Sequence, residues 1–268
     1  MGKAHEIDYT IYGDDMQFVE IGLDPGETIV AEAGAMMYMD SSIVSDTVFG
    51  DGSERDAGKG LMDKMLGAGK RVITGESLFM TTFTNKGQGK KVVSFGAPYP
   101  GKIIPLDLKD YNNQIICQRD AFLCAAKGIA IEIAFQKRIG VGFFGGEGFI
   151  MQRLIGDGMA FIHAGGTIIK KNLEAGEVIK LDTGCLVAMT TGIDYDVQFA
   201  SNVRSAIFGG EGLFLATLKG PGQVWLQSLP FSRLANRVYA ASSKGDNKSK
   251  GEGSVLKGIG LKGLLGDD

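Results

Sequence analysis

Apolar and polar residues alternate with a period of two along short segments before about residue 240, as in a half-buried strand. The clearest examples are Ile129–Phe135 and Val224–Ser228. Turn-forming glycine, proline and aspartate residues separate these segments at intervals of about ten residues, as in Asp24–Gly26 and Gly220–Gly222. This pattern predicts an all-β fold of sandwich-like units rather than strand–helix–strand units.

One internal stretch has helical periodicity. In Lys59–Gly67, Leu61 and Met65 lie four residues apart, and each is followed by another apolar residue, so that one face is apolar. We therefore expect a short helical insertion near 50–70. It either packs on the β-fold or serves as a docking element, as long connections inside compact domains often do.

The composition changes after Tyr239. Ser242–Ser254 is polar and of low complexity, and Val255–Gly266 is apolar, rich in glycine and carries two lysines. Because glycine disfavours a lone helix, 239–268 is predicted to be a flexible C-terminal tail. Ordering of this tail on a membrane surface or a partner remains an alternative.

An internal repeat organises the rest of the chain. Phe143–Ala164 aligns without gaps on Ile207–Ser228, with eight identical residues among 22, and Gly75–Phe83 is a weaker copy. Leu23–Ile29 likewise matches Leu173–Ile179. The matches predict three β-repeats, and packing them around a shared centre would hide their open sheet edges. We therefore expect a pseudo-threefold arrangement of the repeats 1–100, 101–168 and 169–238, the first carrying the insertion.

Composition narrows the function classes. The 28 basic and 31 acidic residues give a net charge of −3, which argues against a generally phosphate-binding surface. Three cysteines are too few for a disulfide framework, and neither a secretory signal nor an apolar run of membrane-spanning length is present. The 41 glycines fit a chain with many tight turns. We expect a cytoplasmic protein.

A series of motifs in fixed order resembles a known family. These motifs are Thr74–Ser77, Pro98–Lys102, Gln118–Phe122, Gly145–Gly148, His163–Gly166, Asp182–Cys185, Gly209–Gly212 and Gly220–Gln227. Across about 7–238 they resemble the altered-inheritance-of-mitochondria (mitochondrial biogenesis) family. The resemblance implies fused β-sandwich repeats like those of the tryptophan RNA-binding attenuation protein. It implies no catalytic residues.

Three glutamates occupy equivalent positions in glycine-containing turns: Glu76, Glu147 and Glu211. If these turns meet near a pseudo-axis, the carboxylates form an interaction or ligand-binding set that holds a cation or shares protons. If the turns lie on a rim, glycine only supplies the turn conformation. The turns lack the lysine and the following helix of a phosphate-binding loop. We assign no catalytic residue, no metal and no cofactor.

The repeat also assigns roles to single side chains. His163 aligns with Gln227, which suggests a structural position that needs a hydrogen-bonding side chain. Phe161 aligns with Trp225, which suggests a core aromatic rather than a base-stacking platform.

The repeat also predicts structural roles for the three cysteines. Cys124 and Cys185 align with apolar residues and are expected to fill apolar positions, whereas Cys117 aligns with a lysine and is expected to face outward.

The favoured function is a non-enzymatic scaffold or binding protein that forms a homo-oligomer, with a trimer as the favoured stoichiometry, and binds an unidentified protein partner. One alternative is a metal- or ligand-binding enzyme that uses the repeated glutamates. A second is an RNA-binding protein, although the acidic balance argues against nucleic acid. A third is a membrane-proximal scaffold that uses the tail.

Overall fold

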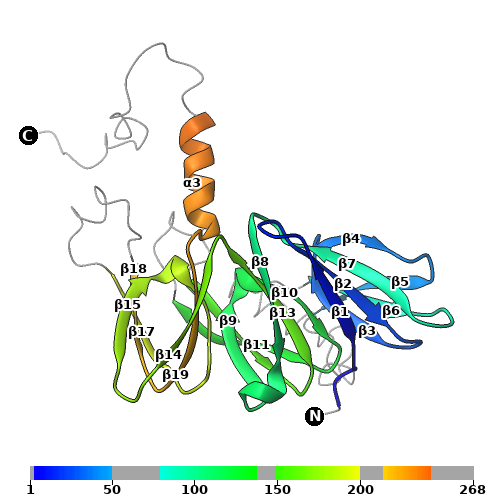
Figure 1. Cartoon of the computed structure of the whole chain (residues 1–268), viewed down its shortest axis with the longest axis horizontal. Coiled ribbons are helices and arrows are strands. Elements are labelled where there is room, and N and C mark those ends of the chain that lie inside the picture. The colour runs from blue at the N-terminus through cyan, green and yellow to red at the C-terminus, as the bar shows by residue number, and fades with distance from the viewer. Residues whose placement is uncertain (1–2, 50–78, 138–148, 200–213, 243–268) are drawn as a thin grey trace, which may run out of the picture. The chain divides into compact units, whose positions relative to one another are not determined.

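The computed structural model describes residues 3–49, 79–137, 149–199 and 214–242, and strands dominate it (Figure 1). In chain order the strands are β1 (Asp8–Tyr12), β2 (Phe18–Leu23), β3 (Thr28–Glu32), β4 (Met36–Met39), β5 (Ile43–Phe49), β6 (Phe79–Asn85), β7 (Lys91–Gly96), β8 (Gly101–Asp107), β9 (Gln114–Gln118), β10 (Phe122–Ala126), β11 (Ala130–Lys137), β12 (Phe149–Ile155), β13 (Met159–Gly165), β14 (Ile168–Leu173), β15 (Val178–Asp182), β16 (Leu186–Met189), β17 (Asp194–Phe199), β18 (Phe214–Lys219) and β19 (Gly222–Gln227). Among the described residues, the 3₁₀ turns are η2 (Leu108–Tyr111), η3 (Arg119–Ala121) and η4 (Thr183–Cys185), and the α-helix α3 spans Phe231–Ser242. The prediction of a mainly β fold is confirmed.

The strands form four antiparallel sheets. Sheet A has the order β1-β2-β7-β4, and sheet B has the order β5-β6-β3-β10-β13-β8. Sheet C has the order β11-β12-β9-β16-β19-β14, and sheet D has the order β15-β18-β17. Sheets B and C therefore join strands from distant parts of the chain.

One order of strand pairing occurs in three successive sets of six strands: β2–β7, β8–β13 and β14–β19. In each set the first and third strands pair with the sixth, and the second and fourth strands pair with the fifth. The third strand of one set also pairs with the second strand of the preceding set, as β10 does with β3 and β16 with β9. These cross-set pairs build the six-stranded sheets B and C.

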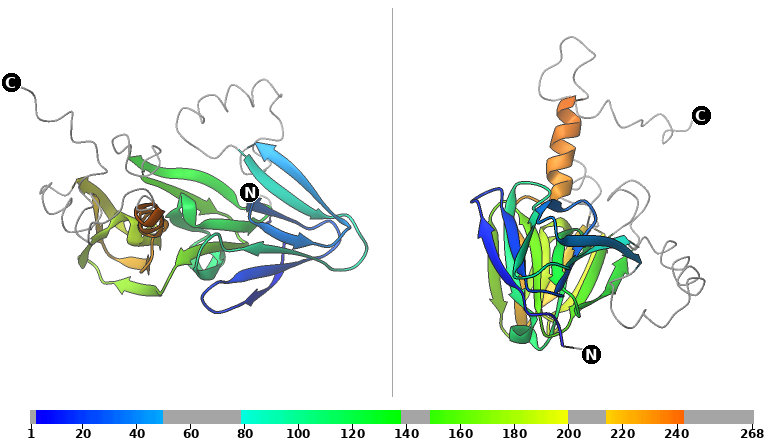
Figure 2. Two further views of the ribbon diagram at one scale, coloured as in Figure 1. Left: turned by 90° about the horizontal axis from the view of Figure 1, so that it is seen from above. Right: turned by 90° about the vertical axis from the view of Figure 1, so that its right-hand side faces the viewer.

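The sheets are stacked in layers (Figure 2), and within the described residues three hydrophobic cores lie between successive sheets. The A–B core includes Phe95 of sheet A and Phe83 of sheet B. The B–C core includes Ile162 of sheet B and Trp225 of sheet C, and the C–D core includes Met151 of sheet C. Sheets B and C are therefore buried on both faces, which explains why many of their strands carry apolar residues at adjacent positions.

The helix α3 was not predicted from the sequence. It belongs to a second compact unit, which begins at Phe231, whereas the first unit ends at Pro230. Its residues Val238 and Tyr239 are exposed, and it continues to Ser242, past the predicted start of the tail at residue 239. The predicted helical insertion at 59–67 lies outside the described residues. No helix in the described part of the chain is long and apolar enough to cross a membrane.

Candidate functional site

The repeated glutamates Glu76, Glu147 and Glu211 all lie outside the described residues. Their convergence near an axis therefore stays a prediction. Within the described residues, no group of three or more histidine, cysteine, aspartate or glutamate side chains is placed to hold a metal ion.

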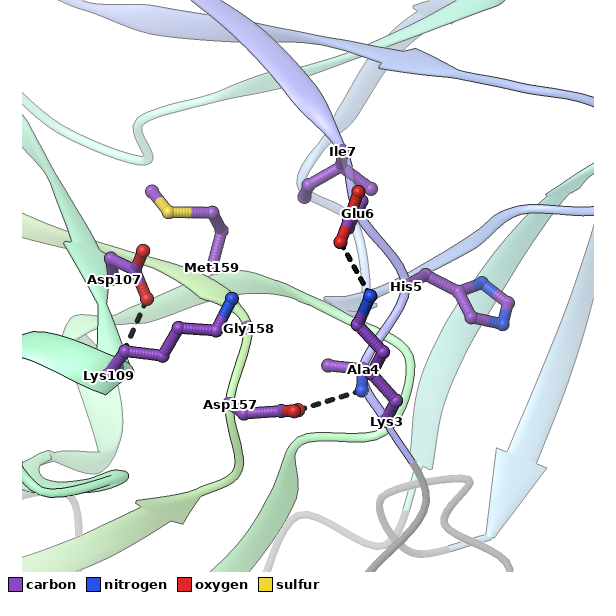
Figure 3. A pocket seen from close by; sticks show the side chains of 10 residues that line it. All are labelled: Lys3, Ala4, His5, Glu6, Ile7, Asp107, Lys109, Asp157, Gly158 and Met159. Carbon is purple, nitrogen blue, oxygen red and sulfur yellow. Dashed lines mark hydrogen bonds and ion pairs between the residues drawn. The ribbon is translucent and has the colours of Figure 1, made fainter.

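A small polar pocket of about 140 Å³ lies beside the N-terminal segment 3–7 (Figure 3). The Ala4 backbone N–H donates to Asp157 Oδ1 at 2.8 Å, and Lys3 Nζ pairs with Glu6 Oε1 at 2.7 Å. The Ala4 N–H is also the main reason that the pKa of Asp157 lies below its usual value. Because these groups bond to one another, we interpret the pocket as the place where the N-terminal segment is fixed to the turn between β12 and β13.

A cluster of ionisable groups surrounds the end of β3, where sheet B passes from the first set of strands to the second. Glu32, the last residue of β3, is partly buried, and burial raises the pKa of its carboxyl to about 7. The negative charge of Asp120 adds to this rise in pKa, and Arg119 opposes it. Gln118, the last residue of β9, donates from Nε2 to the Thr183 carbonyl at 2.8 Å. Glu32 and Gln118 thus each interact with the connection, η3 or η4, that precedes the third strand of the next set.

Replacing Glu32 with glutamine should make the chain relatively more stable at high pH. The folded pKa of Glu32, about 7, exceeds the unfolded value of 4.5, so ionisation costs stability as pH rises from 4.5 through 7. We expect the free energy of unfolding of Glu32→Gln, relative to wild type, to increase by about 2 kcal/mol between pH 5 and pH 8, after a discount for partial exposure.

Urea denaturation at several pH values measures this difference. Glu174→Gln, at an exposed position of a turn, is the control and should show no such trend. A constant difference between Glu32→Gln and wild type would contradict the burial of an ionisable Glu32.

His163 and Gln227 have unlike hydrogen bonding, although they align in the repeat. Gln227 accepts from the Gly165 N–H at 2.8 Å and donates to the Gly184 carbonyl at 2.7 Å. His163 is 1% exposed and packs edge-on against Tyr99 with ring centroids 4.4 Å apart, but neither ring nitrogen makes a hydrogen bond. The prediction of a structural hydrogen-bonding side chain holds for Gln227, whereas His163 is structural through its burial, and the Tyr99 backbone is the polar group that acts on its ring.

The core roles predicted from the repeat are correct for the aromatic pair and for one cysteine. Phe161 lies opposite Cys124 and Trp225 opposite Ala188 in matching strand pairs, and these four residues are buried. Cys117, predicted to face outward, is instead fully buried in the B–C core. Burial raises the pKa of its thiol to about 12, so the thiol is unreactive at neutral pH.

Strands β4 and β15 lie at sheet edges, although their counterparts in the other sets of strands lie inside a sheet. Within the described residues, β4 pairs with β7 alone and β15 pairs with β18 alone, whereas β10 and β16 also pair with the preceding set. Met36, Met37 and Tyr38 of β4 are 40%, 52% and 46% exposed, while every residue of β10 and β16 is buried. Sequence analysis did not single out β4, although its run of large apolar residues without a charge is an unusual composition for an edge strand.

The described strands define an all-β protein of several antiparallel sheets. The family model described as mitochondrial biogenesis AIM24 matches residues 9–229. The chain therefore belongs to this family, and the resemblance found in the sequence motifs is confirmed at the level of the family.

Two proteins of Streptococcus pyogenes are similar to this chain. An uncharacterized protein of the serotype M6 strain is 30% identical over 228 residues, which cover 83% of this chain and 86% of that protein. A crystal structure of a Streptococcus pyogenes protein matches with a TM-score of 0.68 and 24% identity, and covers 88% of this chain and 100% of that chain. The second similarity supports the fold alone.

Proposed function

We propose that this protein is a non-enzymatic scaffold or binding protein that acts as a homo-oligomer. The observation that carries the proposal is that β4 and β15 each pair on one side only within the described residues, whereas their counterparts in the other sets also pair across sets. An exposed apolar edge strand promotes association, and natural proteins normally protect such edges. A self-associating chain would cover these edges.

The proposal includes the interpretation of 1–100, 101–168 and 169–238 as three copies of one β-unit. The recurring order of strand pairing supports it, and so do the aligned pairs of Phe161 and Trp225 with their opposing residues. A pseudo-threefold arrangement of these copies and a likeness to the tryptophan RNA-binding attenuation protein belong to the same proposal. We further propose a cytoplasmic location, a trimer as the favoured state and an unidentified protein partner.

Native mass spectrometry of the untagged full chain, purified from its own host, tests the proposal. We expect an integer multiple of the 28.5 kDa chain mass without a bound ligand. A monomer mass at micromolar concentration would overturn the scaffold proposal. A discrete added mass of a metal, nucleotide or RNA fragment would overturn it in favour of the enzyme or RNA-binding alternative.

A further inference from the structure

The register of the cross-set strand pairs is the same in both places where the chain forms them. Cys124, the third residue of β10, lies opposite Ala31, the fourth residue of β3. Ala188, the third residue of β16, lies opposite Cys117, the fourth residue of β9. The next residue pair is also at equivalent positions in both cases, so the two cross-set pairings have the same register.

Strand β4, which pairs on one side only within the described residues, has the local geometry of β10 and β16, which pair on both sides. Each of β4, β10 and β16 is preceded by a three-residue connection from the second strand of its set. Each also has a register shift against the sixth strand between its first and third residues, for example between Met36 and Tyr38. Likewise, β15 pairs with β18 in the way that β3 pairs with β6 and β9 with β12. The edges of β4 and β15 therefore have the same strand connections and register as the strands that pair across sets.

We propose that β4 of one copy pairs antiparallel with β15 of a second copy, with Tyr38 opposite Leu181 and Met39 opposite Lys180. This inference rests on the proposed self-association and specifies its interface. Sheet D of one copy and sheet A of the next would then form one seven-stranded sheet with β1 at its edge. Its other six strands have the same order of positions as the strands of sheets B and C.

The side chains fit this register. Residues directly opposite each other in an antiparallel pair project to the same face of a sheet. Accordingly, Ala31 and Cys124 share the A–B core, and Cys117 and Ala188 share the B–C core. Leu181 packs against the C–D core, so the half-exposed Tyr38 of the second copy would extend that core and become buried. The interface thus repeats the internal packing.

The proposed contact is heterologous, because it joins two different edges of the chain. Such head-to-tail contacts generate a closed ring or an open filament, depending on the rotation between copies. A closed ring leaves no free β4 or β15, which removes both exposed edges at once. A second copy of this chain is therefore the partner that fits the edges of both β4 and β15.

Cysteine cross-linking tests the register in the full chain. Two single variants, Tyr38→Cys and Leu181→Cys, each also carrying Cys185→Ser, are co-expressed and oxidised mildly with diamide. Because the two variants mix at random, about half of the chains can be cross-linked. We expect about this fraction to run as a covalent dimer on a non-reducing gel, with a 38–181 disulfide found by peptide mass spectrometry. Val178→Cys replaces Leu181→Cys as the control, because three residues along a strand move the thiol by about 10 Å, beyond disulfide reach.

The possible outcomes distinguish failure of the proposed interface from failure of the proposed function. An oligomeric native mass without the 38–181 disulfide would overturn the proposed pairing and leave the scaffold proposal intact. A monomeric native mass would overturn both. In a further variant that carries Tyr38→Cys, Leu181→Cys and Cys185→Ser in one chain, a 38–181 disulfide within a single chain would overturn head-to-tail association in favour of closure of the three sets on themselves.

A charge at the edge gives an independent test without a cross-link. Tyr38→Lys is expected to shift the native mass from the oligomer to the 28.5 kDa chain, because the proposed contact would bury the ammonium group. Ile169→Lys is the matched control, since Ile169 is similarly exposed, at 53%, on the edge strand β14. Equal native masses for the two variants would overturn the inference.

Discussion

Replacing Trp225 with alanine should lower the free energy of unfolding by about 3–5 kcal/mol. Trp225 is 3% exposed and lies in the B–C core, which strands of all three sets help to form. Its ring packs edge-on against Tyr111 with centroids 5.5 Å apart, and Lys170 Nζ lies 4.9 Å from its centroid. The truncation removes this packing and leaves a cavity that two six-stranded sheets cannot close.

Urea denaturation followed by far-ultraviolet circular dichroism measures the effect, because Trp225 is the only tryptophan and its fluorescence is lost in the variant. Trp225→Phe should lose only about 1–2 kcal/mol, since the aligned position of the second set holds Phe161. Ile169→Ala, at an exposed edge position, should change stability by less than about 0.5 kcal/mol. A loss below 1 kcal/mol for Trp225→Ala would contradict its place in the core.

Acidification should destabilise the protein through His163. Burial lowers the pKa of its imidazole to about 4, and a small opposing effect comes from the Tyr99 backbone. Since the unfolded pKa is 6.5, the unfolded chain binds a proton between pH 6.5 and pH 4 that the folded chain does not. Stability contributed by the neutral ring is therefore lost as pH falls through this window, and amounts to about 3 kcal/mol between pH 7 and pH 4.

His163→Gln isolates this effect, because Gln227 shows that glutamine is accepted at the aligned position. Urea denaturation at pH 7 and pH 4 should show that the variant loses about 3 kcal/mol less than wild type on acidification. Glu32 affects stability with the opposite pH dependence. Because the variant and the wild type are compared at the same pH, this contribution is the same in both and cancels. Proton NMR titration of the two histidines provides a second readout, and a folded His163 titrating near pH 6.5 would contradict the prediction.

The strands were predictable because period-two alternation and turn residues are local features. The segments Ile129–Phe135 and Val224–Ser228, chosen from alternation alone, coincide with β11 and β19 to within one or two residues. The helix α3 escaped prediction because arguments from strand spacing carried no information about 231–242. The motif series also sufficed to identify the family that the family model confirms.

The error at Cys117 shows where local reasoning fails. The alignment matched Cys117 with a lysine and suggested an outward side chain, but Cys117 is the fourth residue of β9 and its counterpart, the fourth residue of β15, is Leu181. A slip of one residue exchanges the two faces of a strand, so the alignment assigned Cys117 to the wrong face. Its neighbour Ile116 is buried on the opposite face because β9 lies inside sheet C, between the B–C and C–D cores, and alternation within one strand does not encode this stacking of layers.

By itself, the sequence determined that this chain is an all-β member of the mitochondrial biogenesis AIM24 family, because alternation, turns and motif order are properties of neighbouring residues. Only the tertiary structure decided which strands pair across sets, which faces are buried and which edges stay open. The strands Met36–Met39 and Phe122–Ala126 are both apolar, yet the first three residues of the former are exposed and the latter is buried throughout. Their difference lies in whether a second strand from elsewhere in the chain reaches their backbone.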